Sequence, residues 1–142
     1  MLLLIGKIVH VIGNVLWLGG GAACAFAFAG LAGADAAGRK TFAAALRKII
    51  LTIVTPGMLL SLGAGLVMLL SYWSDLYAKA PWMHAKLTVG LIAAGFSGVL
   101  SGRLRRAAAG TEVSAGSLRL AGGVLVLSAI AGVTFVMTRL GQ

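Results

Sequence analysis

The chain has 142 residues, of which 60% are hydrophobic and only 11% are charged. A soluble domain carries about 25% charged residues and exposes a large fraction of its surface at this size. These proportions exclude an ordinary soluble domain and predict a single all-α membrane domain (residues 1–142) in contact with a lipid bilayer. The net charge of +9 does not predict a nucleic-acid partner, because most basic residues fall between apolar runs.

Apolar runs long enough to cross a bilayer, which takes about 20 residues, occur four times along the chain. The connections between them are short, so neighbouring spans are expected to be antiparallel. The sequence therefore predicts a four-transmembrane-helix bundle, with spans at residues 3–31, 49–72, 82–102 and 120–138.

Basic residues predict the orientation of this bundle. The loops after the first and third spans are expected to hold eight of them: Arg39, Lys40, Arg47, Lys48, Arg103, Arg105, Arg106 and Arg119. The opposite side has only Lys7, Lys79 and Arg139, with an aromatic belt of Tyr72, Trp73, Tyr77 and Trp82. The positive-inside rule then predicts a bacterial inner-membrane protein with both termini in the periplasm.

Small residues recur at every fourth position in three of the spans. Such spacing lets membrane helices approach closely, so we expect packing faces there, within the chain or in a homodimer. The positions are Gly57, Ser61 and Gly65; Gly98 and Gly102; and Ser128 and Gly132.

Four ionisable side chains near the starts of the first and third spans are functional candidates, because burying such groups in a bilayer is costly. They are Lys7, His10, His84 and Lys86. The two spans run in the same direction, so both histidines are expected near the same leaflet. The simpler interpretation is that the histidines are interfacial and the lysines only anchor the helices.

Two histidines on neighbouring helices are suited to bind the iron of haem b from both sides. In the first span His10, Asn14, Trp17 and Gly21 recur at helical spacing and predict one inward face. Lys7 or Lys86 is suited to pair with a haem propionate. A copper or zinc site without haem has too few ligands here. The acids Asp35, Asp75 and Glu112 all lie outside the spans, so no catalytic residue is predicted.

Four segments together resemble the HemJ family, the membrane-bound protoporphyrinogen IX oxidases. The segments are IVHVIGNVLWLGG (Ile8–Gly20), VTPGMLLSLGAGLVML (Val54–Leu69), PWMHAKL (Pro81–Leu87) and SGRLRRAAAG (Ser101–Gly110). The third resembles the Gly-Trp-Leu-His-x-Lys-Leu signature of that family. The same segments resemble CopD-type membrane domains more distantly.

The resemblance implies haem b binding by His10 and His84 and a functional role for Lys86. It also implies a tetrapyrrole substrate whose electrons pass to a quinone. Three stretches depart from the family pattern. AFAFAGLAG stands in place of an Arg…Tyr-His segment, Gly95 and Phe96 in place of a Tyr-His pair, and LRLAGGVLV in place of an Asn-Glu element. The missing polar groups are those suited to bind the substrate or to move its six protons.

Three functions therefore remain open from the sequence. The first is a HemJ-like haem protein that oxidises protoporphyrinogen IX. The second is a non-enzymatic b-type cytochrome, or a haem-binding electron-transfer subunit of a larger membrane complex. The third is a CopD-type membrane protein without haem. The residues support haem binding more strongly than they support catalysis.

Overall fold

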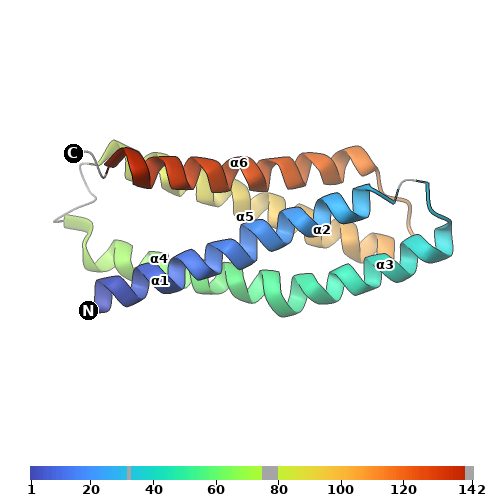
Figure 1. Cartoon of the computed structure of the whole chain (residues 1–142), viewed down its shortest axis with the longest axis horizontal. Helices are drawn as coiled ribbons and strands as arrows, with labels where there is room; N and C mark the ends of the chain where they lie inside the picture. The colour runs from blue at the N-terminus through green and yellow to red at the C-terminus, as the bar shows by residue number, and fades with distance from the viewer. Residues whose placement is uncertain (32, 75–79, 140–142) are drawn as a thin grey trace.

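The chain folds into helices that run back and forth along one long axis (Figure 1). The computed structural model describes residues 1–31, 33–74 and 80–139. The regular structure within these ranges is helical throughout. The segments are α1 (Leu2–Asn14), η1 (Val15–Gly19), α2 (Gly20–Ala29), α3 (Ala36–Ile49), η2 (Ile50–Val54), α4 (Thr55–Ser71), α5 (Pro81–Ala108) and α6 (Ala115–Arg139).

Four helical stretches of the described chain are long and apolar enough to cross a membrane. They are Leu3–Ala29, Ala36–Ser71, Pro81–Ala108 and Ala115–Phe135, and they confirm the predicted all-α bundle. Large apolar side chains point away from the bundle, with Leu70 72%, Leu91 75% and Leu127 66% exposed. An apolar surface of this kind is stable against lipid tails and not against water. The chain is therefore an integral, multi-pass membrane protein.

The helices extend well beyond the predicted spans at one end of the bundle. The second stretch begins at Ala36, the third continues to Ala108, and α6 begins at Ala115. The eight basic residues expected in two loops are thus on helices, which corrects the loop assignment. Charged residues end a run of high hydropathy, but Ala, Arg and Lys are all good helix formers. Lys79 and Tyr77 lie outside the described residues.

Local signals explain where these extended helices begin and end. The Oδ1 atom of Asp35 accepts a hydrogen bond of 2.8 Å from the backbone N–H of Gly38 and so caps the start of α3. After α5, Gly110 has a φ of +90°, a conformation that favours glycine, and the chain turns there toward α6. Both features lie at the end that carries the basic residues, which we call the basic end.

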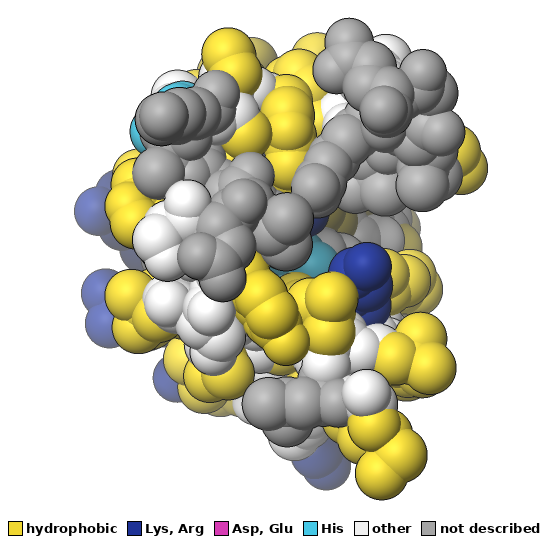
Figure 2. All heavy atoms as spheres, turned by 90° about the vertical axis from the view of Figure 1, so that its left-hand side faces the viewer, with side chains coloured by type: hydrophobic (Ala, Val, Ile, Leu, Met, Phe, Trp, Pro, Cys, Tyr) yellow, Lys and Arg dark blue, Asp and Glu magenta, His cyan; other side chains and the backbone are white. Residues whose placement is uncertain are grey.

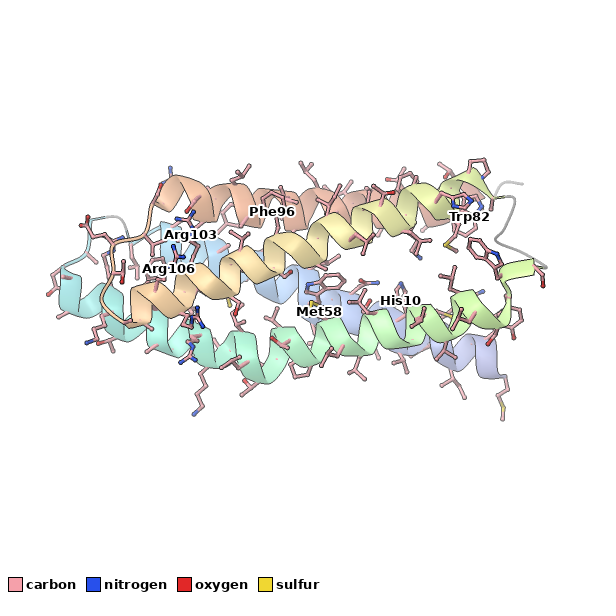
Figure 3. All side chains as sticks on the ribbon, turned by 180° about the vertical axis from the view of Figure 1, so that it is seen from behind. His10, Met58, Trp82, Phe96, Arg103 and Arg106 are labelled. Carbon is pink, nitrogen blue, oxygen red and sulfur yellow. The ribbon has the colours of Figure 1, made fainter. Side chains whose placement is uncertain are left out.

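The helices pack as a tight core in one half of the molecule and as two separate pairs in the other. Nineteen buried apolar residues of the described chain form a core from η1, α2, α3, η2, the later part of α5, the turn that follows it and the start of α6. In the other half α1 packs along α4, and α5 packs along α6. Within the described residues α1 and α5 barely approach one another. Figure 3 shows the ribbons of α5 and of the α1–α4 pair diverging toward the end of the bundle opposite the basic end. We call this the open end.

Glycines allow α1 and α4 to pack backbone against backbone. A Cβ added at Gly13 would lie 2.6 Å from the backbone nitrogen of Ser61, and one at Gly57 would lie 2.7 Å from Cβ of Leu16. The predicted small-residue face of the second span is therefore confirmed as a packing face. Among the described residues nothing lies within 4 Å of a Cβ position at Gly98 or Gly102, so that face is open toward the rest of the described structure.

Candidate cofactor site

His10 lies on α1 at the open end, with its ring turned toward α4. Its Nδ1 atom is 2.7 Å from the carbonyl oxygen of Ser61 and 3.2 Å from the Oγ of the same residue. A Cβ at Gly65 would lie 3.1 Å from Cε1 and Nδ1 of the ring, so the glycine leaves room for the imidazole. In Figure 3 the labelled His10 lies between α5 and the α1–α4 pair.

Ser61 connects His10 to Asn14 and is completely buried. Its hydroxyl donates a hydrogen bond of 2.9 Å to Oδ1 of Asn14. A carbonyl oxygen only accepts, so Nδ1 of His10 donates to Ser61, and the hydroxyl then donates onward to Asn14. The sequence predicted Ser61 only as a small packing residue. One feature of the sequence could have identified it: Ser61 is a hydroxyl residue in an otherwise apolar run, on the same helix face as Gly57 and Gly65.

Lys86 lies on the inward face of α5, opposite His10. Helical geometry places Ala93, Ser97 and Leu104 within about 20° of Lys86 around the helix axis. Ala93 and Leu104 are buried, so this is the face that enters the bundle. Lys86 itself is half-buried. The structure thus joins His10 to Asn14 through Ser61 and places Lys86 on the inward face of α5.

His84 lies elsewhere on α5 and is exposed. Two residues along a helix correspond to about 200° of rotation, so His84 and Lys86 project to opposite sides. The His84 ring meets the Trp73 ring edge to face, with centroids 5.9 Å apart. Figure 2 looks onto the open end and shows one histidine recessed between the helices beside a Lys or Arg side chain, and the other at the rim. The structure therefore does not bring His84 to His10.

The first turn of α5 also turns a sulfur-bearing residue inward. Met83 is only 8% exposed, whereas its neighbour His84 is exposed. It lies three residues before Lys86, and positions three apart share one side of a helix. Sequence reasoning missed Met83, because a methionine in an apolar segment is ordinarily read as core. The available signal was its spacing from Lys86.

Trp17 joins the first span to α5 near the middle of the bundle. It is 2% exposed, and its Nε1–H donates a hydrogen bond of 2.7 Å to the hydroxyl of Ser97 on α5. That hydroxyl donates in turn to the carbonyl of Ala93, at 2.9 Å. Trp17 belongs to the π-helical segment η1, and π segments are frequent at functional sites. His10 and Trp17 thus contact different helices, α4 and α5.

The remaining predicted groups lie at the periphery of the open end. Lys7 is exposed on α1, one turn before His10. Of the residues predicted to form an aromatic belt, Tyr72 and Trp82 are half-buried there, and Trp73 is exposed. Figure 3 labels Trp82 at this end of α5. Among residues 1–31, 33–74 and 80–139, no three His, Cys, Asp or Glu side chains converge.

Comparison with protein families, with curated proteins and with solved structures finds no match to this chain. The resemblance to the HemJ family stays a prediction from the quoted segments. The site offers the imidazole of His10, whose Nδ1 is already hydrogen-bonded, and the half-buried amine of Lys86. It also offers the buried thioether of Met83 and the buried indole of Trp17.

Proposed function

We propose that the chain is a HemJ-like membrane b-type haem protein that transfers electrons, with the haem held at the open end between the α1–α4 and α5–α6 pairs. The observation that carries this proposal is the 2.7 Å bond from His10 Nδ1 to the Ser61 carbonyl. With the proton on Nδ1, the Nε2 atom keeps its lone pair. A metal-binding histidine ordinarily has this arrangement, in which the second nitrogen donates to a carbonyl or carboxylate.

The first turn of α5 would supply a second ligand to the haem iron. His84 is the candidate from the sequence, and its exposure means that its side chain has to turn inward to reach the iron. Met83 is already buried on the side of α5 that carries Lys86. Histidine and methionine together are an established ligand pair for electron-transfer haems. We therefore favour Met83 over His84.

Charge and shape at the open end support a haem in other ways. Lys86 is half-buried and suited to neutralise a propionate, and the exposed Lys7 offers a second cation nearer the membrane surface. Trp17, buried about two helical turns beyond His10, is suited to form a flat apolar wall against the macrocycle. When bound, haem b supplies one-electron redox chemistry. The protein contributes a ligand, a counter-charge and exclusion of water.

We favour electron transfer over catalysis because of where the acidic residues lie. Oxidation of protoporphyrinogen IX to protoporphyrin IX releases six electrons and six protons, and proton acceptors are needed for it. Asp35 and Glu112 are at the basic end, and Asp75 lies outside the described residues. The oxidase remains the second candidate. Lys86 favours it, because a half-buried lysine in the recess also suits the propionates of a tetrapyrrole substrate, with a quinone as electron acceptor.

The positive-inside rule gives the proposed orientation of the protein in the membrane. With the basic end in the cytoplasm of a bacterium, both termini face the periplasm, and the haem lies toward the outer leaflet of the inner membrane. The open glycine face of α5, at Gly98 and Gly102, suits contact with a second copy or with a larger membrane complex.

The test is redox spectroscopy on the purified full-length chain. We expect a Soret band, and α and β bands that appear on reduction by a quinol or by dithionite. A correctly folded protein that contains no haem after expression with excess haem, and takes up none on titration, overturns the proposal. Rescue of a bacterial strain that lacks protoporphyrinogen oxidase would support the oxidase over the electron carrier.

A further inference from the structure

The basic end contains two adjoining cavities that the proposed function does not use. The larger, of about 440 Å³, is lined by Arg39, Glu112 and the three residues that follow Glu112. The smaller, of about 170 Å³, is lined by Arg39, Lys40 and Glu112 together with apolar residues that include Phe28 and Ala107. Arg39 and Glu112 line both cavities. The larger volume falls within the usual range for small-ligand sites, about 300–1,000 Å³.

Arg39 is held in place at the boundary of these cavities. One terminal nitrogen donates a hydrogen bond of 3.3 Å to the carbonyl of Val113, and the guanidinium lies 5.8 Å from the centroid of the Phe28 ring. A guanidinium has five N–H donors, and this bond uses one of them. A fixed guanidinium next to open space is a preorganised site for an anion, since phosphate oxygens accept two of its N–H groups at once.

The surrounding charge favours an anion as well. Lys40 adds a second cation to the smaller cavity. Arg103 and Arg106 project from α5 at the same end and are labelled in Figure 3. The carboxylate of Asp35 already accepts the capping bond from Gly38. Glu112 is the opposing charge, and its position on both cavities means that it weakens anion binding.

The lengths of the first and second spans, together with the Phe28–Arg39 contact, place this site at the membrane surface. Ala36–Ser71 contains 36 residues, so at 1.5 Å per residue the helical stretch is about 54 Å long. The hydrocarbon core of a bilayer is about 30 Å thick. The open end has the aromatic residues of an interface, so the excess length falls at the basic end. The first residues of this stretch therefore extend past the headgroups. Phe28 lies near the end of the first span, Leu3–Ala29, which is about 40 Å long, so its ring lies at the level of the headgroups. The Arg39 guanidinium, 5.8 Å from that ring, lies there with it.

We propose that the cavities at Arg39 and Lys40 bind the phosphate of an anionic phospholipid headgroup. Phe28 and Ala107, which line the smaller cavity, are suited to contact the first carbons of its acyl chains. Basic pockets between membrane helices are known to accept such headgroups. The proposal is independent of the haem site, which lies at the opposite end of the bundle.

Native mass spectrometry of the full-length chain in detergent, titrated with phosphatidylglycerol or with phosphatidylcholine, tests this site. A basic residue at a membrane surface contributes about 1 kcal/mol to anionic-lipid binding, which corresponds to about fivefold in affinity. We expect Lys40→Gln to weaken phosphatidylglycerol binding about fivefold and Arg39→Gln at least as much. Glu112→Gln should tighten it. Phosphatidylcholine should bind weakly to all variants.

The matched control removes two charges from the exposed side of the same helix. The double variant Arg47→Gln/Lys48→Gln should change phosphatidylglycerol binding less than twofold, although it loses more charge than Lys40→Gln. Equal losses in both would show a general surface effect and overturn the site. Displacement of the lipid by millimolar inorganic phosphate would assign the cavities to a free anion and overturn the lipid assignment. Arg39 also packs within the fold, so Lys40→Gln and Glu112→Gln, both at exposed positions, decide the outcome if Arg39→Gln unfolds.

Discussion

The Nδ1 atom of His10 lies 2.7 Å from the carbonyl oxygen of Ser61, a residue 51 positions further along the chain. This contact joins the first and second spans at the open end and determines which ring nitrogen remains available. Ser61 also bonds Asn14, so one buried serine fixes two polar side chains of α1. The ring orientation therefore depends on the close packing of α1 against α4.

The close packing of α1 and α4 predicts a strong effect at Gly13. In Gly13→Ala the new methyl group would lie 2.6 Å from the backbone nitrogen of Ser61, and backbone cannot move aside cheaply. We expect a loss of about 1–3 kcal/mol in the free energy of unfolding, the usual cost of overpacking. Gly63→Ala is the control, because nothing lies within 4 Å of its Cβ position. It should be neutral or stabilising by up to about 1 kcal/mol. Denaturant unfolding in mixed micelles measures both, and equal losses would refute the packing account.

The Trp17–Ser97 bond predicts a measurable coupling between the first and third spans. Hydrogen bonds between membrane helices average about 0.6 kcal/mol in double-mutant cycles. We expect a coupling of that size from the unfolding free energies of Trp17→Phe, Ser97→Ala and the double variant. Additive losses in the cycle would show that the two side chains pack together without a bond that stabilises the fold.

A charge at Lys86 predicts a shift of the haem reduction potential. A nearby cation disfavours the more positive ferric state, so it raises the potential. Lys86→Gln should therefore lower the midpoint potential and weaken haem retention. Lys7→Gln removes the same charge from an exposed position of α1, where solvent and salt screen it, and should have a smaller effect. Potentiometric titration compares the two, and a larger shift from Lys7→Gln would contradict the proposed position of the propionate.

The choice between Met83 and His84 as second ligand predicts different spectra for two leucine variants. Met83→Leu keeps the apolar volume but removes the sulfur, so it should abolish a sulfur–iron charge-transfer band and lower the midpoint potential. His84→Leu should leave both unchanged. Electron paramagnetic resonance of the ferric protein gives an independent reading of the ligands. A bis-histidine signature that is lost in His84→Leu would restore the prediction made from the sequence.

The number of spans was predictable because the apolar blocks are long and separated by charges. The residues at which the helices begin and end were harder to predict. Hydropathy falls at Arg39 and Arg103, but a helix continues wherever the backbone stays bonded and good helix formers follow. The π-helical segment η1 was also unforeseen. A π turn takes more residues than an α turn, so the positions after it rotate. Asn14 then contacts α4 while Trp17 contacts α5, and the single inward face predicted for them is divided.

The candidate site was predictable only in part. An isolated histidine or lysine in an apolar run is conspicuous because its burial is costly, and this signal identified His10 and Lys86. The side of α5 that faces the bundle is determined by its packing against α3 and α6. The spacing of His84 and Lys86 at the start of the helix does not reveal that packing. His84 therefore appeared equivalent to His10 in the sequence, although it lies exposed beside Trp73. Ser61 and Met83 were overlooked because serine and methionine are common in packed membrane helices.

The central claim is that Nε2 of His10 binds the haem iron, and chemical rescue tests it most directly. In His10→Gly the imidazole ring is removed, and free imidazole can occupy the vacated space. We expect this variant to lose the low-spin Soret and α bands and added imidazole to restore them. His84→Gly, measured in parallel, should keep its spectrum without imidazole. A His10→Gly protein that retains an unaltered haem spectrum in the absence of imidazole would contradict the account.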